Sequence, residues 1–486
     1  MRRSVIVNHR GMPFVANKSS YDSAGQGRRA SNWYAPRSGP NDALVGSLDT
    51  LRNRSRAGYR NNPWIRQGVN SLVSNEIGTG IIPRSRVEDE DFRRSQNALW
   101  DRSADEMDAD GVLDIYGMQA LCSRTRRQAG EVFVRRRMRQ DSDGLAVPIQ
   151  FQILEPEFVP IWLNQTAANG NQIRHGIEID LRGRRVAYWM YREHPDDSSA
   201  RVDASELVRV PADSVIHHYL PLRPGQLRGE PVTAQALLKA YTFDSYDDAE
   251  LVRKQTRAPY TGFIKKEYVG EDDWKFDPMT GEPVNEGDDG VPSINAEPGT
   301  FLSGLPGEEP VMFDGDDTGA GYADFMRQQI LGMGVGLGVP YEILSGDWSK
   351  VNDRLVRAIL HEFRRSIEAD QDHLMIFQVC RRIWHWWTDA AVMRGRLEAR
   401  QYALRRHEYL AHEWRPQGWP YLHPTQDVEA KIKAIEHNLA SHEGEAAKTG
   451  WDLEQIQRDN VEAEKRFREL RREAGLPESS EQSEGL

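Results

Sequence analysis

Glycine occupies every second position from Gly332 to Gly338, directly before the segment Val339-Pro340-Tyr341. Each glycine in a helix interior costs about 1 kcal/mol relative to alanine, and glycine also lets another backbone approach closely. An amphipathic helical pattern runs into these glycines from Tyr322, and a second one begins near Asn352. The pattern predicts two helices joined by a tight turn, the first of which ends or kinks against a neighbouring backbone.

Composition limits the class of protein. With 486 residues the chain is long enough for two to four domains, and its mean hydropathy of -0.68 favours an elongated or oligomeric protein over one compact enzyme. No apolar run approaches the ~18 residues that a membrane span needs, and the apolar patch near the N-terminus is too short for a secretory signal. Cys122 and Cys380 are too far apart in sequence to suggest a disulfide framework or a metal site, which favours a reducing cytoplasm.

Charge is distributed in blocks of one sign. The segment Glu267–Asp317 has fifteen acidic residues against one lysine, a charge of -14, whereas the whole chain carries only -11. Met1–Arg66 has twelve basic residues against three aspartates, a charge of +9. Such blocks are either solvated insertions or interaction surfaces. The glycine, proline and aspartate content of the acidic block predicts loops and short strands instead of a helix.

Hydrophobic periodicity predicts a mixed α and β chain. A helix is expected over 64–77, ended by Gly78 and Gly80, and an alternating strand over 131–139. A hairpin is expected to turn at Arg182-Gly183, and one long helix to run over 231–257. Residues 352–397 are expected to form one or two helices, with Trp384, Trp386 and Trp387 in a core, and 424–475 to be helical and strongly charged.

No catalytic, cofactor or metal motif is complete in this sequence. The glycine run 332–338 does not fit G-x-G-x-x-G, and the chain has no G-x-x-x-x-G-K-[ST] phosphate loop. His407 and His412 are five residues apart, which does not place both imidazoles on one helical face for zinc. The pair His217-His218 lies in an alternating apolar strand and is expected to be structural. The sequence therefore predicts no enzyme and no cofactor.

Four motifs follow one another along the chain: Asn61–Pro83, with its N-N-P helix running into a G-T-G-I strand; Arg223–Pro231 (RPGQLRGEP); Pro298–Phe313 (PGTFLSGLPGEEPVMF); and the glycine run with its V-P-Y and S-G-D turn. In this order they resemble the lambda-like portal proteins of tailed bacteriophages. The chain departs from the family pattern at Val351–Arg357, where the family has an N-Y-S-S-x-R type of segment.

The resemblance implies the α+β portal fold, assembled as a ring. It divides the chain into a basic, disordered arm (1–40), a mixed wing (41–230), a first stem helix (231–257), an acidic clip (258–319), a second stem helix (320–338), a turn and tunnel loop (339–353), a tunnel helix with a return to the wing (354–423), a helical crown (424–475) and a disordered tail (476–486).

The resemblance also implies a function: a non-enzymatic head–tail connector at one capsid vertex, through which double-stranded DNA is packaged and ejected. Its partners would be eleven further copies in a twelve-subunit ring, the terminase large subunit, capsid or scaffold proteins and a head-completion adaptor, without a membrane. It would be found in the virion after assembly in the host cytoplasm. Two alternatives stay open: a metal-dependent nucleic-acid-processing enzyme whose acidic segment holds the metal, and a head structural protein without a channel.

Candidate site residues follow from the implied parts. Tunnel-loop candidates for DNA contact are Asp347, Lys350, Asn352, Asp353 and Arg354. Stem candidates for the channel lumen are Asp244, Asp248, Arg253, Lys254 and Arg257. Clip candidates for docking terminase or adaptor are Glu271, Asp272, Asp273, Asp288 and Asp289. The alternative for the stem set is an ordinary solvated helix face, and for the loop a solvent loop in which Asn352 or Asp353 caps a helix.

Overall fold

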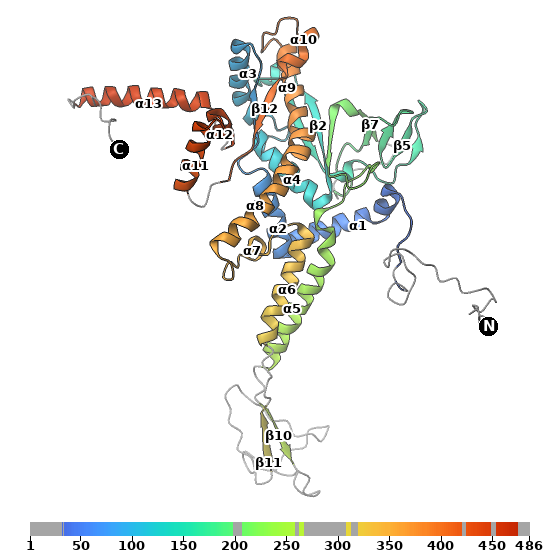
Figure 1. Ribbon diagram of the computed structural model, residues 1–486. Coiled ribbons are helices and arrows are strands. Elements are labelled where there is room, and N and C mark those ends of the chain that lie inside the picture. The colour runs from blue at the N-terminus through green and yellow to red at the C-terminus, as the bar shows by residue number, and fades with distance from the viewer. Residues whose placement is uncertain are drawn as a thin grey trace, which may run out of the picture.

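The computed structural model describes residues 32, 34–197, 207–257, 262–266, 308–312, 319–419, 424–448 and 453–474. Figure 1 shows a mixed body of helices and sheets, a pair of helices that projects from it toward a small hairpin, and a helical C-terminal part on one side. The predicted α+β class is confirmed. The predicted N-terminal arm and C-terminal tail lie almost wholly outside the described residues.

The first part of the chain is helical. Its helices are α1 Pro40–Asn61, α2 Pro63–Glu76, α3 Glu90–Ser103 and α4 Ile115–Ala129, with a 3-10 turn at Ala104–Glu106. Asn62 ends α1 and caps α2, because its side chain accepts a hydrogen bond from the Ile65 amide at 2.9 Å and Pro63 needs no partner for its nitrogen. Gly78 and Gly80, both with positive φ, follow α2, as predicted.

Two antiparallel sheets make up most of the β structure. The three-stranded sheet has the order β3-β2-β9, from Ile149–Leu154, Glu131–Met138 and Val215–Tyr219. The five-stranded sheet runs β4 Gln165–Thr166, β5 Gln172–Arg174, β6 Ile177–Ile179, β7 Arg185–Met190 and β8 Val208–Pro211. The predicted hairpin is β6–β7, turning at Gly183 with φ +79°. Short 3-10 turns lie at Asp141–Asp143, Pro156–Phe158 and Ala212–Ser214.

The first half of strand β2 is covered on both faces, so its consecutive residues Val132, Phe133 and Val134 are all apolar and buried. Val132 and Val134 point into the largest core, together with Trp100, Trp384 and Trp387. Phe133, from the opposite face, lies in a smaller core between the two sheets. The three tryptophans at 384, 386 and 387 are all buried, so the prediction that they belong to a core is confirmed.

The chain then leaves the body and returns. A 3-10 turn at Val232–Gln235 leads into α5 Leu237–Arg257, so the helix predicted from 231 begins instead with a tighter turn. The strands β10 Gly262–Lys266 and β11 Glu308–Met312 pair antiparallel beyond the end of α5, and α6 Gly319–Leu337 runs back to the body (Figure 1).

The short helix α7 Tyr341–Ser345 comes next. A continuous helical stretch then crosses the body, formed by α8 Asp353–Asp370, a π-helix at Gln371–Cys380 and α9 Arg381–Met393. The π-helical stretch was not predicted. After α10 Tyr402–Tyr409, the strand β12 His412–Arg415 pairs with β1 Ile82–Ser85. The C-terminal helices are α11 Pro424–Glu436, α12 His442–Lys448 and α13 Leu453–Glu473.

Two fully buried carboxylates hold these parts together. Glu131 of β2 accepts hydrogen bonds from Arg52 of α1, from Arg228 at 2.6 Å and from the Gly229 amide at 2.9 Å, and its other contact is His217 of β9 at 2.7 Å. Glu76, at the end of α2, pairs with Arg126 and Arg127 of α4, which also reach Asp370 at the end of α8.

These buried groups predict acid sensitivity. Burial lowers the pKa of His217 to about 4 and that of His218 to about 3, from 6.5. Unfolding below pH 6.5 therefore takes up protons that the folded chain does not bind, and each proton lowers stability by about 1.4 kcal/mol per pH unit. Burial would raise the pKa of Glu76, but Arg127 and Arg126 outweigh it and lower the value to about 2, so further stability is lost as pH falls from 4.5 toward 2.

Urea denaturation between pH 4 and pH 8 measures this effect. We expect maximal stability above pH 6.5 and a steep decline below it. His218 donates from Nδ1 to the Gln378 side-chain oxygen at 2.8 Å, a bond that asparagine can replace. His218→Asn should therefore flatten the decline between pH 6.5 and 4, and an unchanged slope would contradict this explanation.

Candidate functional site

The two projecting helices α5 and α6 are anchored in the body by an apolar core of their own. Ala240 and Phe243 of α5 and Met333 of α6 are buried there with Ile65 of α2 and Phe363 of α8. Toward the hairpin the helices meet through aromatic side chains instead. Tyr246 of α5 lies 4.9 Å from Phe325 and 6.3 Å from Tyr322 of α6, measured between ring centres. The two helices therefore contact each other both where they meet the body and farther toward the hairpin.

Three of the candidate residues for the channel lumen make contacts with other residues of this chain. Asp244 accepts a hydrogen bond from Asn62 at 2.8 Å, so it joins α5 to α2. Arg253 pairs with Glu250 at 2.5 Å, and Lys254 lies 5.1 Å from the centre of the Tyr322 ring. Tyr322 also donates to Asp247, which raises the pKa of this tyrosine to about 12. Asp248 is exposed.

The remaining stem candidate, Arg257, ends α5, and its side chain lies outside the described residues.

The glycine run forms the junction between the projecting helices and the body. The helix α6 passes through Gly332, Gly334 and Gly336 without a break and ends at Leu337, where Gly338 takes φ +73°. A Cβ on Gly334 would lie 2.7 Å from the Val339 carbonyl oxygen. The predicted close backbone approach is thus confirmed, together with the helix end, while the alternative of a mid-helix kink is not observed.

A short loop connects this junction to α8. Gly346, with φ +71°, ends α7, and Asp347 then accepts hydrogen bonds from the amide and hydroxyl of Ser349, at 3.0 and 2.5 Å. Both bonds lower the pKa of the Asp347 carboxyl group, and the bond from the Ser349 hydroxyl has the larger effect. The side chains of Trp348 and Lys350 are exposed. Asp347 is therefore occupied in shaping the loop, whereas Lys350 is available to an external anion.

The start of α8 is built by local hydrogen bonds. Asn352 is its N-cap and accepts from the Leu355 amide at 2.9 Å, so the helix-cap alternative is confirmed for this residue. Asp353 pairs with Arg357 one turn later at 2.6 Å. Arg354 is exposed. Of the five loop candidates, Lys350 and Arg354 are thus the two that present a positive charge to solvent.

Sequence reasoning missed a basic face on α8. Arg354, Arg357, His361 and Arg364 follow one another at three- and four-residue spacing, which places them on one side of the helix. They lead to a cavity of about 510 Å³ lined by Arg357, His361, Arg364, Arg365 and Trp419, among others. The Arg364 guanidinium lies 5.4 Å from the centre of the Trp419 ring. The three- and four-residue spacing of these basic residues was the signal in the sequence that could have predicted this face.

The five clip candidates, Glu271, Asp272, Asp273, Asp288 and Asp289, lie outside the described residues. What the structure describes is the base of the segment that holds them. Lys266 of β10 pairs in register with Glu308 of β11, in the hairpin beyond the far end of the helical pair (Figure 1). Within the acidic block, the described strand β11 agrees with the prediction of short strands instead of a helix.

Among the described residues, one group has the composition of a metal site: Glu155, Glu157 and His194. Arg56 already pairs with Glu155 at 3.1 Å and with Glu157 at 2.8 Å, which offsets one of the two negative charges of the group. The group lies in the body, apart from the acidic segment. None of the helices within the described ranges is long and apolar enough to cross a membrane.

Comparison with known proteins identifies the family. The family model described as "Phage portal protein, lambda family" matches residues 26–371. The "Probable portal protein" of Halomonas phage phiHAP-1 is 27% identical over 463 residues, covering 92% of this chain and 86% of the relative. "Portal protein B" of Escherichia phage lambda is 22% identical, covering 92% and 89%. A chain from the virion of a native gene transfer agent particle matches with 12% identity and a TM-score of 0.45. The match covers 87% of this chain and 97% of that one. Since the family model spans well over half of its length, the chain belongs to the lambda family of phage portal proteins.

Proposed function

We propose that this chain is the head–tail connector of a phage or phage-like particle, placed in the virion at one capsid vertex. The observation that carries the proposal is the family match from residue 26 to residue 371, which spans the body, the projecting helices and the loop before α8. In this assignment the body is the wing, α5 and α6 are the stem, the hairpin end is the clip, α8 and the π-helix form the tunnel helix, and α11–α13 form the crown. The role is mechanical and electrostatic, without catalysis.

Exposed apolar side chains support assembly into a ring. Leu238 and Tyr241 on α5 are 76% and 74% exposed, and Val335 on α6 is 76% exposed. On α13, where no residue is buried, Phe467 and Leu470 are each 56% exposed. In a closed ring, each subunit contacts its two neighbours through two different, complementary faces. These contacts would cover such exposed apolar side chains. Twelve subunits is the number that the family resemblance implies.

Ring formation can be tested on the purified chain by native mass spectrometry and negative-stain images. We expect closed rings of 55.5 kDa subunits with a central hole. The double variant Leu238→Ser/Tyr241→Ser should shift most of the protein to monomers, because it removes apolar surface worth about 2 kcal/mol or more per side chain at every interface. Leu181→Ser, at a 93% exposed position in the β6–β7 turn, is the control and should form rings normally. Rings unaffected by the stem variant would contradict the proposed stem contact.

Electrostatics suit a channel for DNA. Strong phosphate contacts would hold a duplex in place, so a conducting wall should be acidic or neutral with a few separated positive charges. Asp247 and Asp248 on α5 are exposed acidic groups, and Lys350 and Arg354 are the exposed cations near the loop. We assign Lys350 and Arg354 to weak DNA contact, and the basic face of α8 extends this positive surface.

Charge reversal tests the loop. Lys350→Glu, repeated in every subunit, is expected to lower the amount of DNA retained per particle several-fold while rings still form, because it replaces a phosphate contact by repulsion. The DNA content of purified particles, measured against capsid protein, gives the result. Lys465→Glu, in the exposed face of α13, makes the same charge change elsewhere and should leave DNA content unchanged. Equal loss in both variants would point to net charge instead of the loop.

The acidic segment is proposed to dock the terminase large subunit during packaging and a head-completion adaptor afterwards. The support is its charge of -14 and its place in the chain between α5 and α6, where the described strands β10 and β11 pair. We assign its contacts to Glu271, Asp272, Asp273, Asp288 and Asp289. Capsid or scaffold proteins are proposed to contact the wing side of the ring.

A further inference from the structure

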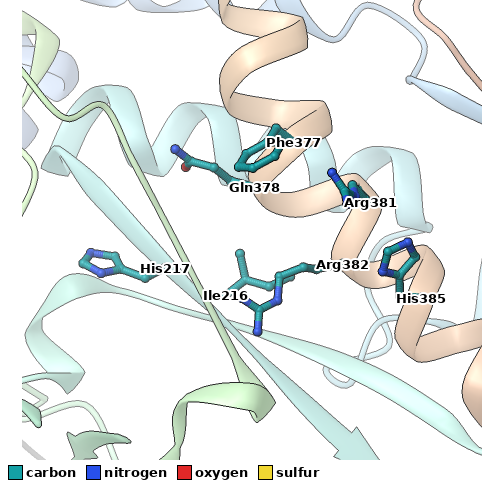
Figure 2. A pocket seen from close by; sticks show the side chains of 7 residues that line it. All are labelled: Ile216, His217, Phe377, Gln378, Arg381, Arg382 and His385. Atoms are coloured by element: carbon teal, nitrogen blue, oxygen red, sulfur yellow. The ribbon is translucent and has the colours of Figure 1, made fainter. Parts of the chain in front are cut away.

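A second pocket lies in the body, and no residue of α5, α6 or the loop before α8 lines it. Its volume is about 350 Å³, and its lining comes from β9, the π-helix and α9: Ile216, His217, Phe377, Gln378, Arg381, Arg382 and His385. Figure 2 shows the last five of these on one continuous helical stretch beside the strand that carries Ile216 and His217. The lining contains two guanidinium groups and no carboxylate.

The strand at this pocket is the edge of its sheet, because the order of the sheet is β3-β2-β9. At Tyr219, the main-chain groups point away from β2: its amide donates to the Gln378 side-chain oxygen, and its carbonyl accepts from the Gln378 nitrogen, both at 3.1 Å. Main-chain direction alternates along an antiparallel strand. The amide and carbonyl of His217, two residues earlier, therefore also point away from β2, toward the pocket.

Exposure supports this orientation. The side chain of His217 is only 2% exposed, since it contacts Glu131 at 2.7 Å and Arg185 at 3.1 Å on the inner face. The residue as a whole is nevertheless only half-buried. The part of His217 that solvent can reach is therefore its main chain. The neighbouring outward positions are occupied, because Gln378 bonds to Tyr219 and the Val215 amide donates to Ala212. The edge is open at a single residue.

The charges beside this opening are held in place but are not neutralised. Arg381 stacks over Phe377, with 5.5 Å from guanidinium to ring centre, and Arg382 stacks over Trp386 at the same distance. The Arg382 guanidinium also donates to the Ala212 carbonyl at 3.5 Å. Neither arginine pairs with a carboxylate within the described ranges. Burial lowers the pKa of His385 to about 4, so this imidazole is neutral near pH 7 and leaves the positive charge to the arginines.

We propose that this pocket binds a short, extended, acidic segment of a partner protein, one residue of which exchanges two backbone hydrogen bonds with His217 while adjacent carboxylates pair with Arg381 and Arg382. Addition of a strand at a sheet edge gives backbone affinity, and the arginines give selectivity for acidic side chains. A phosphate group would satisfy the His217 amide but offers no donor to its carbonyl, which favours a peptide over nucleic acid. The site lies beyond the connector function and does not depend on it.

Fluorescence anisotropy on the full chain tests the site with a fluorescein-labelled peptide, Gly-Glu-Val-Glu-Gly-amide. We expect saturable binding that Arg381→Ala/Arg382→Ala weakens at least about tenfold, since two charge-assisted contacts are lost. Arg174→Ala/Arg182→Ala removes two exposed arginines from the other sheet and should bind normally. Circular dichroism confirms that both variants fold. No binding at about 1 mM peptide, or equal binding by all three proteins, would overturn the proposal.

Backbone pairing is tested separately. N-methylation of the peptide's valine removes the donor expected to reach the His217 carbonyl and should weaken binding several-fold, whereas N-methylation of its first glutamate should have little effect. In hydrogen exchange, the peptide should slow the amide of His217. If both methylated peptides bind like the parent, the attraction is charge alone and the edge-pairing proposal fails. Tighter binding of an oligothymidylate, lost in Arg381→Ala/Arg382→Ala, would assign the pocket to nucleic acid and would also overturn it.

Discussion

Glu131→Gln is expected to lower the free energy of unfolding by about 3–5 kcal/mol, well above the cost of an ordinary surface substitution. Glutamine has nearly the same shape but no charge, so the guanidinium groups of Arg52 and Arg228 would remain buried without compensation. Both arginines are 1% exposed or less. Burial alone would raise the pKa of Glu131, but Arg228 and then Arg52 hold it well below its usual value, so the carboxylate is charged in the folded chain.

The measurement is urea denaturation of the variant beside the parent chain at pH 7.5. Asp101→Asn provides the control, because Asp101 also pairs with an arginine, Arg84 at 3.0 Å, but is 54% exposed. An exposed pair of this kind contributes at most about 1 kcal/mol. If Glu131→Gln costs no more than Asp101→Asn, the buried cluster does not stabilise the fold through its charge.

Loss of stability at Glu131 should also have a structural consequence. The carboxylate connects α1, β2, β9 and the segment that leads into the stem, through Arg52, His217, Arg228 and the Gly229 amide. We therefore expect Glu131→Gln to speed hydrogen exchange in these four segments together. Faster exchange confined to β2 would show that the segments are held by their own packing.

Gly334→Ala is expected to abolish functional assembly, although alanine is ordinarily the better helix former. The new Cβ would lie 2.7 Å from the Val339 carbonyl oxygen, closer than such atoms approach. Because that oxygen belongs to the backbone, either the end of α6 or the turn at Gly338-Val339 must move. This turn sets the position of α7 and the loop relative to the stem, so we expect a loss of at least about 1–3 kcal/mol and a displaced loop.

Gly321→Ala is the matched control for this prediction. Gly321 is in the same helix, but a Cβ there meets nothing within 4 Å. That variant should gain up to about 1 kcal/mol in helix propensity. Thermal denaturation should thus shift in opposite directions for the two variants, and only Gly334→Ala should reduce the yield of DNA-filled particles. A stabilised Gly334→Ala would show that the junction can relax without cost.

Short-range interactions were predictable from the residues alone. Helix ends and caps could be located, because Asn352, Gly78 and Gly338 act on residues within four positions of themselves. The glycine run predicted a close backbone contact for the same reason. Asn352, one of the five loop candidates for DNA contact, is the N-cap of α8. Its presence in the sequence is therefore explained by helix capping alone.

Long-range partnerships were not predictable from these patterns. The cluster at Glu131 combines residues 52, 131, 217 and 228, whose meeting depends on how the sheet edge packs against α1 and the stem entry. The π-helix at Gln371–Cys380 likewise has long-range partners, since Gln371 bonds to the Glu76 carbonyl at 2.7 Å and Gln378 to the edge of β9.

The sequence by itself determined the elements, their order and the family, because periodicity, caps, glycines and motifs are local properties of the chain. Only the tertiary structure decided which charges are buried and paired, which cations stay open to solvent and where the edge of a sheet is exposed. Those outcomes depend on desolvation and on distances between residues more than a hundred positions apart, such as His217 and Arg381, which no local pattern encodes.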